Sequence, residues 1–145
     1  MKQVIRYKKK ILGIIVKNAT KNKKEGIQFF SPSNFTQQLG LFNHRTGKTI
    51  KPHTHNKFIR KINKTTEVLF ILDGVLRVDF YKNRKEYLYS KIIRKNDLII
   101  LNEGSHGFKV IKKVKMFEVK QGPYYKKVDK IKFEAVDEKK VKIKK

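Results

Sequence analysis

Short apolar runs, separated by turn residues, recur along the chain roughly every ten positions. Residues 67–72 and 75–81 form two such runs on either side of Asp73-Gly74, and Asp-Gly between two strands is a strong hairpin signal. The other expected strands are residues 11–16, 26–30, 36–44, 86–93, 97–101, 107–111 and 114–120. This pattern predicts an all-β sandwich or barrel.

The chain has 145 residues, which predicts a single domain. We expect that domain to span residues 1–135 and to begin with an N-terminal strand segment. Residues 136–145 are rich in lysine, and we expect this tail to fray. The chain has no cysteine, which excludes thiol nucleophiles, thiolate metal sites and disulfides.

The chain is strongly basic: 37 Lys and Arg residues stand against 12 acids, for a formal charge of +25. The lysines are spread along the sequence and arginine is scarce, so we expect nucleic acid to bind only non-specifically. The longest apolar run, residues 11–16, is too short to span a membrane. These features predict a cytoplasmic protein without membrane association.

The most informative motif is His53-Thr54-His55. In a strand, residues i and i+2 project from the same face, so the two imidazoles could converge on one point. A pair of this kind can form half of a metal site in an all-β protein. The alternative interpretation is two solvated histidines in a loop.

The residues around the histidine pair form a longer pattern. Gly47 precedes His53 with five residues between them, and Glu67 precedes Gly74 with six between them. Residues 97–106 then read as a strand, a glycine turn and His106. This order resembles the two motifs of the cupin superfamily.

The resemblance implies a small cupin-type β-barrel, a double-stranded β-helix or jelly roll. It also implies one divalent metal ion bound by His53, His55, Glu67 and His106. A donor set of nitrogen and oxygen suits Fe, Mn, Ni, Co or Zn. The eleven residues between His55 and Glu67 exceed the usual spacing and predict an inserted segment there.

By this resemblance, the expected function is that of a metal-dependent isomerase, epimerase or oxygenase. Its substrate would be a small anionic polar molecule such as a sugar or nucleotide-sugar, as in polysaccharide biosynthesis. Arg60, in the inserted segment, could bind a phosphate or carboxylate of that substrate.

Two alternatives stay open. One is a metal-free cupin isomerase or epimerase in which His53 or His55 acts as general base. The other is a non-catalytic protein that binds a small ligand or a polyanion. We also expect a homodimer, with residues 4–16 as the edge or exchanged strand.

Overall fold

The computed structural model describes residues 1–125 and 129–145, and these form strands and two short 3₁₀ turns without an α-helix. No helix among the described residues has the length and apolar character needed to cross a bilayer. The strands are β1 (Lys2–Tyr7), β2 (Lys10–Val16), β3 (Gly26–Phe29), β4 (Gly40–Asn43), β5 (Glu67–Tyr81), β6 (Tyr87–Arg94), β7 (Leu98–Leu101) and β8 (Ser105–Lys120). The 3₁₀ turns are η1 (Ala19–Lys21) and η2 (Glu138–Lys140). The all-β prediction is confirmed.

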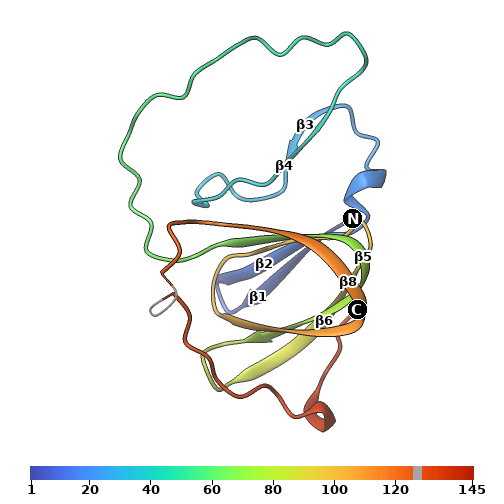
Figure 1. Cartoon of the computed structure of the whole chain (residues 1–145), viewed down its shortest axis with the longest axis vertical. Coiled ribbons are helices and arrows are strands. Elements are labelled where there is room, and N and C mark those ends of the chain that lie inside the picture. Colours follow the sequence, from blue (N-terminus) through green and yellow to red (C-terminus); the bar gives the residue numbers. More distant parts are fainter. Residues whose placement is uncertain (126–128) are drawn as a thin grey trace.

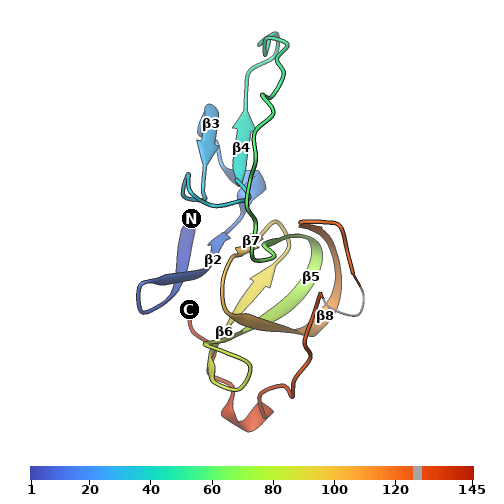
Figure 2. The same ribbon diagram turned by 90° about the vertical axis from the view of Figure 1, so that its left-hand side faces the viewer.

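Six strands form one antiparallel sheet, in the order β1-β2-β7-β5-β6, with β8 added to β5; β3 and β4 form a separate hairpin. One edge of β5 pairs first with β7 and then with β6, while its other edge pairs with β8 along nearly its whole length. The sheet curves strongly around itself (Figures 1 and 2). Within the described residues it does not close into a complete barrel.

The two faces of the sheet bury separate apolar clusters, because successive side chains of a strand point to opposite faces. Leu69 and Ile71 of β5 belong to the inner cluster, whereas Val68 packs against the outer one. The buried inner residues are Ile5, Leu12, Ile15, Leu69, Ile71, Leu76, Val78, Phe80, Ile93, Ile99 and Leu101. The outer cluster includes Phe30 and Leu39, from the segment that crosses this face.

The hairpin predicted at Asp73-Gly74 is wrong, because β5 continues through this dipeptide. Gly74 has a φ of +90° and lies where the register between β5 and β8 shifts. A Cβ atom there would overlap the carbonyl oxygen of Lys113. A glycine with positive φ serves a bulge as well as a turn. On the partner strand, the two runs predicted at residues 107–111 and 114–120 likewise join into β8.

The lysine-rich C-terminus differs from the frayed tail that its composition suggests. Ser90 of β6 donates its N–H to the carbonyl of Lys142 and accepts the N–H of Lys144. The Arg77 guanidinium, which is buried beside Asp79, also binds the Glu138 carboxylate through both terminal nitrogens. These contacts fix the tail against the edge of β6 and over Arg77 of β5, where Glu138 accepts hydrogen bonds from guanidinium N–H groups that Asp79 alone does not satisfy.

The strand predicted over residues 36–44 is shorter in the structure, where β4 covers Gly40–Asn43. After β4 the chain leaves the β3–β4 hairpin, and residues 45–63 pair with no described strand and are exposed throughout. Figure 1 shows this stretch, in teal to green, looping away from the sheet and returning to the start of β5. We call residues 45–63 the arm.

Replacing Gly74 by alanine should destabilise the protein much more than the same change at Gly26. Both glycines have a strongly positive φ, but a Cβ at Gly26 would meet nothing within 4 Å. We expect Gly74→Ala to lower the free energy of unfolding by roughly 3 kcal/mol or more, and Gly26→Ala by about 1 kcal/mol. Urea denaturation measures both values. Equal losses would show that β5 and β8 do not approach closely at Gly74.

Candidate functional site

Glu67 and His106 meet at one end of the inner face of the sheet. The imidazole Nε2 of His106 lies 2.9 Å from the carboxylate Oε2 of Glu67. Glu67 is almost fully buried, whereas about a quarter of the His106 side chain is exposed. The pair therefore joins a buried carboxylate to an imidazole that solvent can reach.

The curvature of the sheet produces this contact. Glu67 pairs with Lys120 at one end of the ladder between β5 and β8, and His106 pairs with Phe80 near the other end. In a straight strand the 13 positions from Glu67 to Phe80 would span roughly 40 Å. Because Glu67 also pairs with Leu101 of β7, the short turn after Leu101 brings the start of β8 back to it.

Neighbouring side chains keep the Glu67 carboxyl group ionised. The pKa of Glu67 is lowered from 4.5 to about 2, chiefly by the hydrogen bond from His106 and against the opposing effect of burial. The positive charge of Lys130, whose Nζ lies 3.3 Å from Oε1, contributes to this lowering. A carboxylate can only accept hydrogen bonds, so Nε2 of His106 must donate. In the neutral ring Nδ1 then carries the free lone pair.

Three polar side chains near this pair have buried atoms without a hydrogen-bond partner among the described residues. They are Thr66 Oγ1, Asn102 Oδ1 and Gln121 Nε2. Thr66 donates its backbone N–H to Gln121 Oε1, and the pairing of Glu67 with Leu101 puts Thr66 and Asn102 at the same edge. Buried polar atoms usually have partners, so these donors and acceptors suit a polar ligand.

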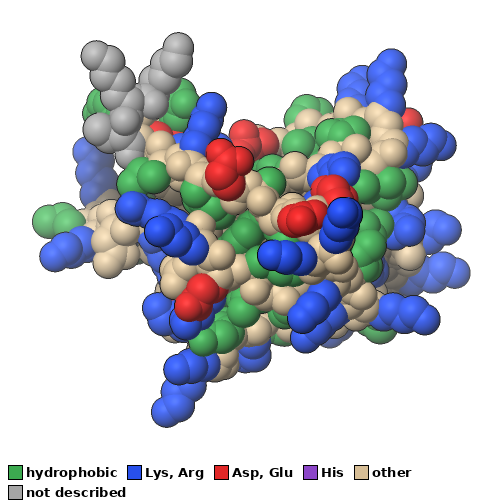
Figure 3. Space-filling view, turned by 90° about the horizontal axis from the view of Figure 1, so that it is seen from below, with side chains coloured by type: hydrophobic (Ala, Val, Ile, Leu, Met, Phe, Trp, Pro, Cys, Tyr) green, Lys and Arg blue, Asp and Glu red, His purple; other side chains and the backbone are tan. Residues whose placement is uncertain are grey.

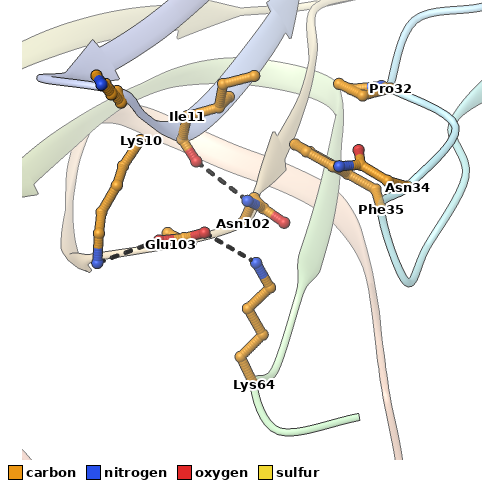
Figure 4. A pocket seen from close by; sticks show the side chains of 9 residues that line it. Lys10, Ile11, Pro32, Asn34, Phe35, Lys64, Asn102 and Glu103 are labelled. Atoms are coloured by element: carbon orange, nitrogen blue, oxygen red, sulfur yellow. Dashed lines mark hydrogen bonds and ion pairs between the residues drawn. The ribbon is translucent and has the colours of Figure 1, made fainter. Parts of the chain in front are cut away.

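A cleft of about 540 Å³ has Asn102 in its lining (Figure 4), and neither Glu67 nor His106 is among its lining residues. Glu103 lies between two lysines there: Lys64 Nζ is 3.1 Å from Oε1, and Lys10 Nζ is 3.6 Å from Oε2. The hydrogen bond from Lys64 lowers the pKa of Glu103. The lining residues are Lys9, Lys10, Ile11, Pro32, Asn34, Phe35, Lys64, Asn102 and Glu103. With three lysines against one carboxylate, the cleft favours an anionic ligand.

A second hollow, of about 600 Å³, shares Lys64, Asn102 and Glu103 with this cleft. It also reaches Asp129, the neighbour of Lys130. On the face shown in Figure 3, Lys and Arg side chains project in all directions and do not gather in one patch. Basic charge alone does not mark a site on this protein; lysines that converge on a hollow do.

The structure places the predicted metal ligands in two separate pairs. Glu67 and His106 are in contact, whereas His53 and His55 lie on the exposed arm, with ring centroids 5.4 Å apart. His53 Nδ1 donates to the carbonyl oxygen of Lys51. Among the described residues, no group of three or more His, Cys, Asp or Glu side chains is arranged to hold a metal ion.

Arg60 also lies on the arm. Its guanidinium stacks over the Phe58 ring, 3.6 Å from the centroid. In this arrangement the arm presents a cation at its surface.

Sequence reasoning does not find the residues that surround Glu67 and His106. Lys130 comes from the segment after β8, and nothing in its own sequence neighbourhood points to Glu67. Thr66 and Asn102 could be suspected only because each adjoins an element of the predicted motifs. Their burial without partners follows from tertiary packing.

Comparison of the chain with protein-family models, with curated proteins and with solved structures finds no match.

The Glu67 carboxylate should make stability sensitive to acid. Because its pKa is about 2 in the folded protein and near 4.5 when unfolded, its contribution is fully present above about pH 4.5. That contribution is lost as the pH falls from 4.5 toward 2. Glu67→Gln should therefore flatten the dependence of unfolding free energy on pH in this window, as measured by urea denaturation. Glu25→Gln, at an exposed ion pair, should keep the wild-type slope. A Glu67→Gln protein with the wild-type slope would contradict this assignment.

Proposed function

We propose that this chain is a divergent cupin that binds a small anionic molecule next to Glu67 and uses His106 as a general base. The observation that carries the proposal is the hydrogen bond between Glu67 and His106, which directs the lone pair of Nδ1 away from the carboxylate. The curved antiparallel sheet supports a cupin-type β-barrel as the parent fold. The cupin motifs also imply that Glu67 and His106 should face one site, and these residues meet although they are 39 positions apart.

The proposed reaction is an isomerisation or epimerisation of a sugar derivative. In such a reaction a base removes a proton from a carbon next to a carbonyl group. Nδ1 of His106 takes that proton, the electron pair of the C–H bond moves onto the carbonyl oxygen to give an enolate, and the Glu67 carboxylate stabilises the imidazolium that results. The imidazolium then returns the proton to the neighbouring carbon in an isomerisation, or water supplies a proton to the opposite face of the same carbon in an epimerisation. Lys130 holds the second oxygen of Glu67, which keeps the carboxylate in place during the transfer.

The lysines of the neighbouring cleft supply the affinity for an anionic group. Lys64 belongs to both hollows, and the segment that carries it leads directly into Glu67. A phosphate or carboxylate bound there would leave the rest of the molecule near the unpartnered polar atoms of Thr66, Asn102 and Gln121. Arg60 would add a further cation if the arm folds over the cleft.

Metal binding is the second candidate function, and the donor chemistry of the same pair favours it. Glu67 and His106 supply a carboxylate and an imidazole in contact, and His53 and His55 lie together on the arm. In the structure these four residues do not form one donor set. A site with all four ligands would need the arm to bring its histidines to the sheet.

The homodimer expected from the sequence also stays a proposal. Residues 4–16 form most of the hairpin β1–β2, and Ile5, Leu12 and Ile15 bury their side chains in the inner cluster. The outer strand β1 pairs only with β2 among the described residues.

A general base should exchange the hydrogen on the substrate carbon next to the carbonyl for deuterium from the solvent. We would incubate the protein in D₂O with phosphorylated keto sugars and nucleotide-sugars and follow the signals of protons next to the carbonyl by NMR. We expect exchange in at least one compound and a loss of roughly 100-fold or more in His106→Ala. The double variant His53→Ala/His55→Ala should exchange within about threefold of wild type, because neither ring contacts Glu67. Exchange that persists in His106→Ala would contradict the assignment.

Elemental analysis distinguishes the metal candidate from the metal-free one. If all four predicted ligands hold a metal, wild-type protein grown with Fe, Mn, Ni, Co and Zn should carry about one ion per chain, and His53→Ala and His106→Ala should both lose it. If the function is metal-free, all three proteins should carry equally little metal. If His53→Ala loses the metal ion and His106→Ala keeps it, the ion is bound by the arm alone. That result would contradict a site shared by the arm and the sheet.

A further inference from the structure

The longest strand, β8, has one free edge. It comprises Ser105–Lys120, and within residues 1–125 and 129–145 it pairs only with β5. Among the described residues, the backbone hydrogen bonds outside the sheet ladders include none from β8. Figure 2 shows β8 on the outside of the curved sheet with β5 next to it. A row of free N–H and C=O groups on such an edge is a template for another strand.

The side chains of β8 are unusual for a free edge because several large apolar ones are exposed. The Phe117 side chain is 63% exposed. The other exposed apolar residues of the strand are Phe108, Val110, Ile111 and Val119. Proteins usually protect free edges with charges and keep apolar groups off them. Exposed apolar side chains along an unpaired strand instead indicate a docking surface.

The charge of β8 indicates what can dock. The strand carries five lysines and one glutamate. Lys109 and Lys120, toward its ends, form ion pairs with Glu138 and Asp129. The central lysines, Lys112, Lys113 and Lys115, form no ion pair with a described residue. A second copy of this chain, paired through the same edge, would place these lysines near their own equivalents.

We infer that the free edge of β8 binds an extended acidic polypeptide segment, which adds to the sheet as one more strand. The backbone edge supplies the hydrogen bonds, and the central lysines bind the carboxylates of the segment. Alternate apolar residues of the segment pack on the exposed apolar side chains of β8. Nucleic acid fits the edge less well, because it cannot use the free N–H and C=O groups as a ladder. This inference is independent of the function proposed for Glu67 and His106.

A synthetic peptide of about ten residues that alternates glutamate and valine is a suitable probe. A strand of this length can pair with β8 on both sides of Lys112, Lys113 and Lys115. Fluorescence anisotropy at physiological salt would measure its binding to the full chain. We expect binding, together with slower amide exchange in β8. A peptide of the same sequence with every backbone amide N-methylated keeps its charge but has no N–H group on either edge with which to pair as a strand. It should bind at least roughly tenfold more weakly.

The matched protein variants separate this site from general charge attraction. The triple variant Lys112→Glu/Lys113→Glu/Lys115→Glu should weaken peptide binding by about tenfold or more. The triple variant Lys21→Glu/Lys23→Glu/Lys24→Glu has the same change in charge on exposed residues between β2 and β3, and should weaken binding less than about threefold.

Equal effects of the two triple variants, or equal binding of the two peptides, would overturn the inference in favour of diffuse polyanion attraction. Absence of peptide binding would overturn it as well. If an oligouridylate protects the β8 amides and the peptide does not, the partner is nucleic acid and the inference is wrong.

Discussion

Strand β5 forms hydrogen bonds along both of its edges, and the rest of the main sheet depends on that double pairing. One edge binds β7 and β6 in succession, and the other binds β8. Right-handed twist accumulates along this strand of 15 residues, and the sheet bends with it. Gly74 admits the change of register at the middle of β5, where a side chain would collide with β8. The bend then encloses the inner apolar cluster.

The chemistry of the candidate site follows from where Glu67 lies on that strand. As the first residue of β5, it faces inward with Leu69 and Ile71 but sits at the open end of the inner cluster. A carboxylate there is costly unless it is paired. His106 and Lys130 supply the partners, and each comes from a different part of the chain. The site therefore exists only in the folded sheet, and its electrostatics depend on the same curvature as the core.

Short apolar runs separated by turn residues were sufficient to predict the all-β class, because runs of this length and spacing suit strands and are too short for helices. They could not distinguish a turn from a bulge at Gly74, since both need a positive φ. The high lysine content of the C-terminal tail predicted that it would fray. Nothing in the local sequence indicated that Glu138 would bind the buried Arg77. The resemblance to cupin motifs predicted that Glu67 and His106 belong to one site, and the structure brings these two residues into contact. The resemblance also pointed to His53 and His55, which lie on the exposed arm and do not join Glu67 and His106 in the structure.

The central claim is that Glu67 fixes the ring of His106 so that Nε2 carries the proton and Nδ1 the lone pair. Long-range ¹H–¹⁵N NMR of the ring nitrogens, recorded in alkaline buffer, tests this claim directly. The account predicts a single tautomer protonated at Nε2, with a slowly exchanging ring proton that disappears in Glu67→Ala. The exposed ring of His55 in the same sample provides the comparison. A His106 ring that averages between tautomers, or that is unchanged by Glu67→Ala, would contradict the account.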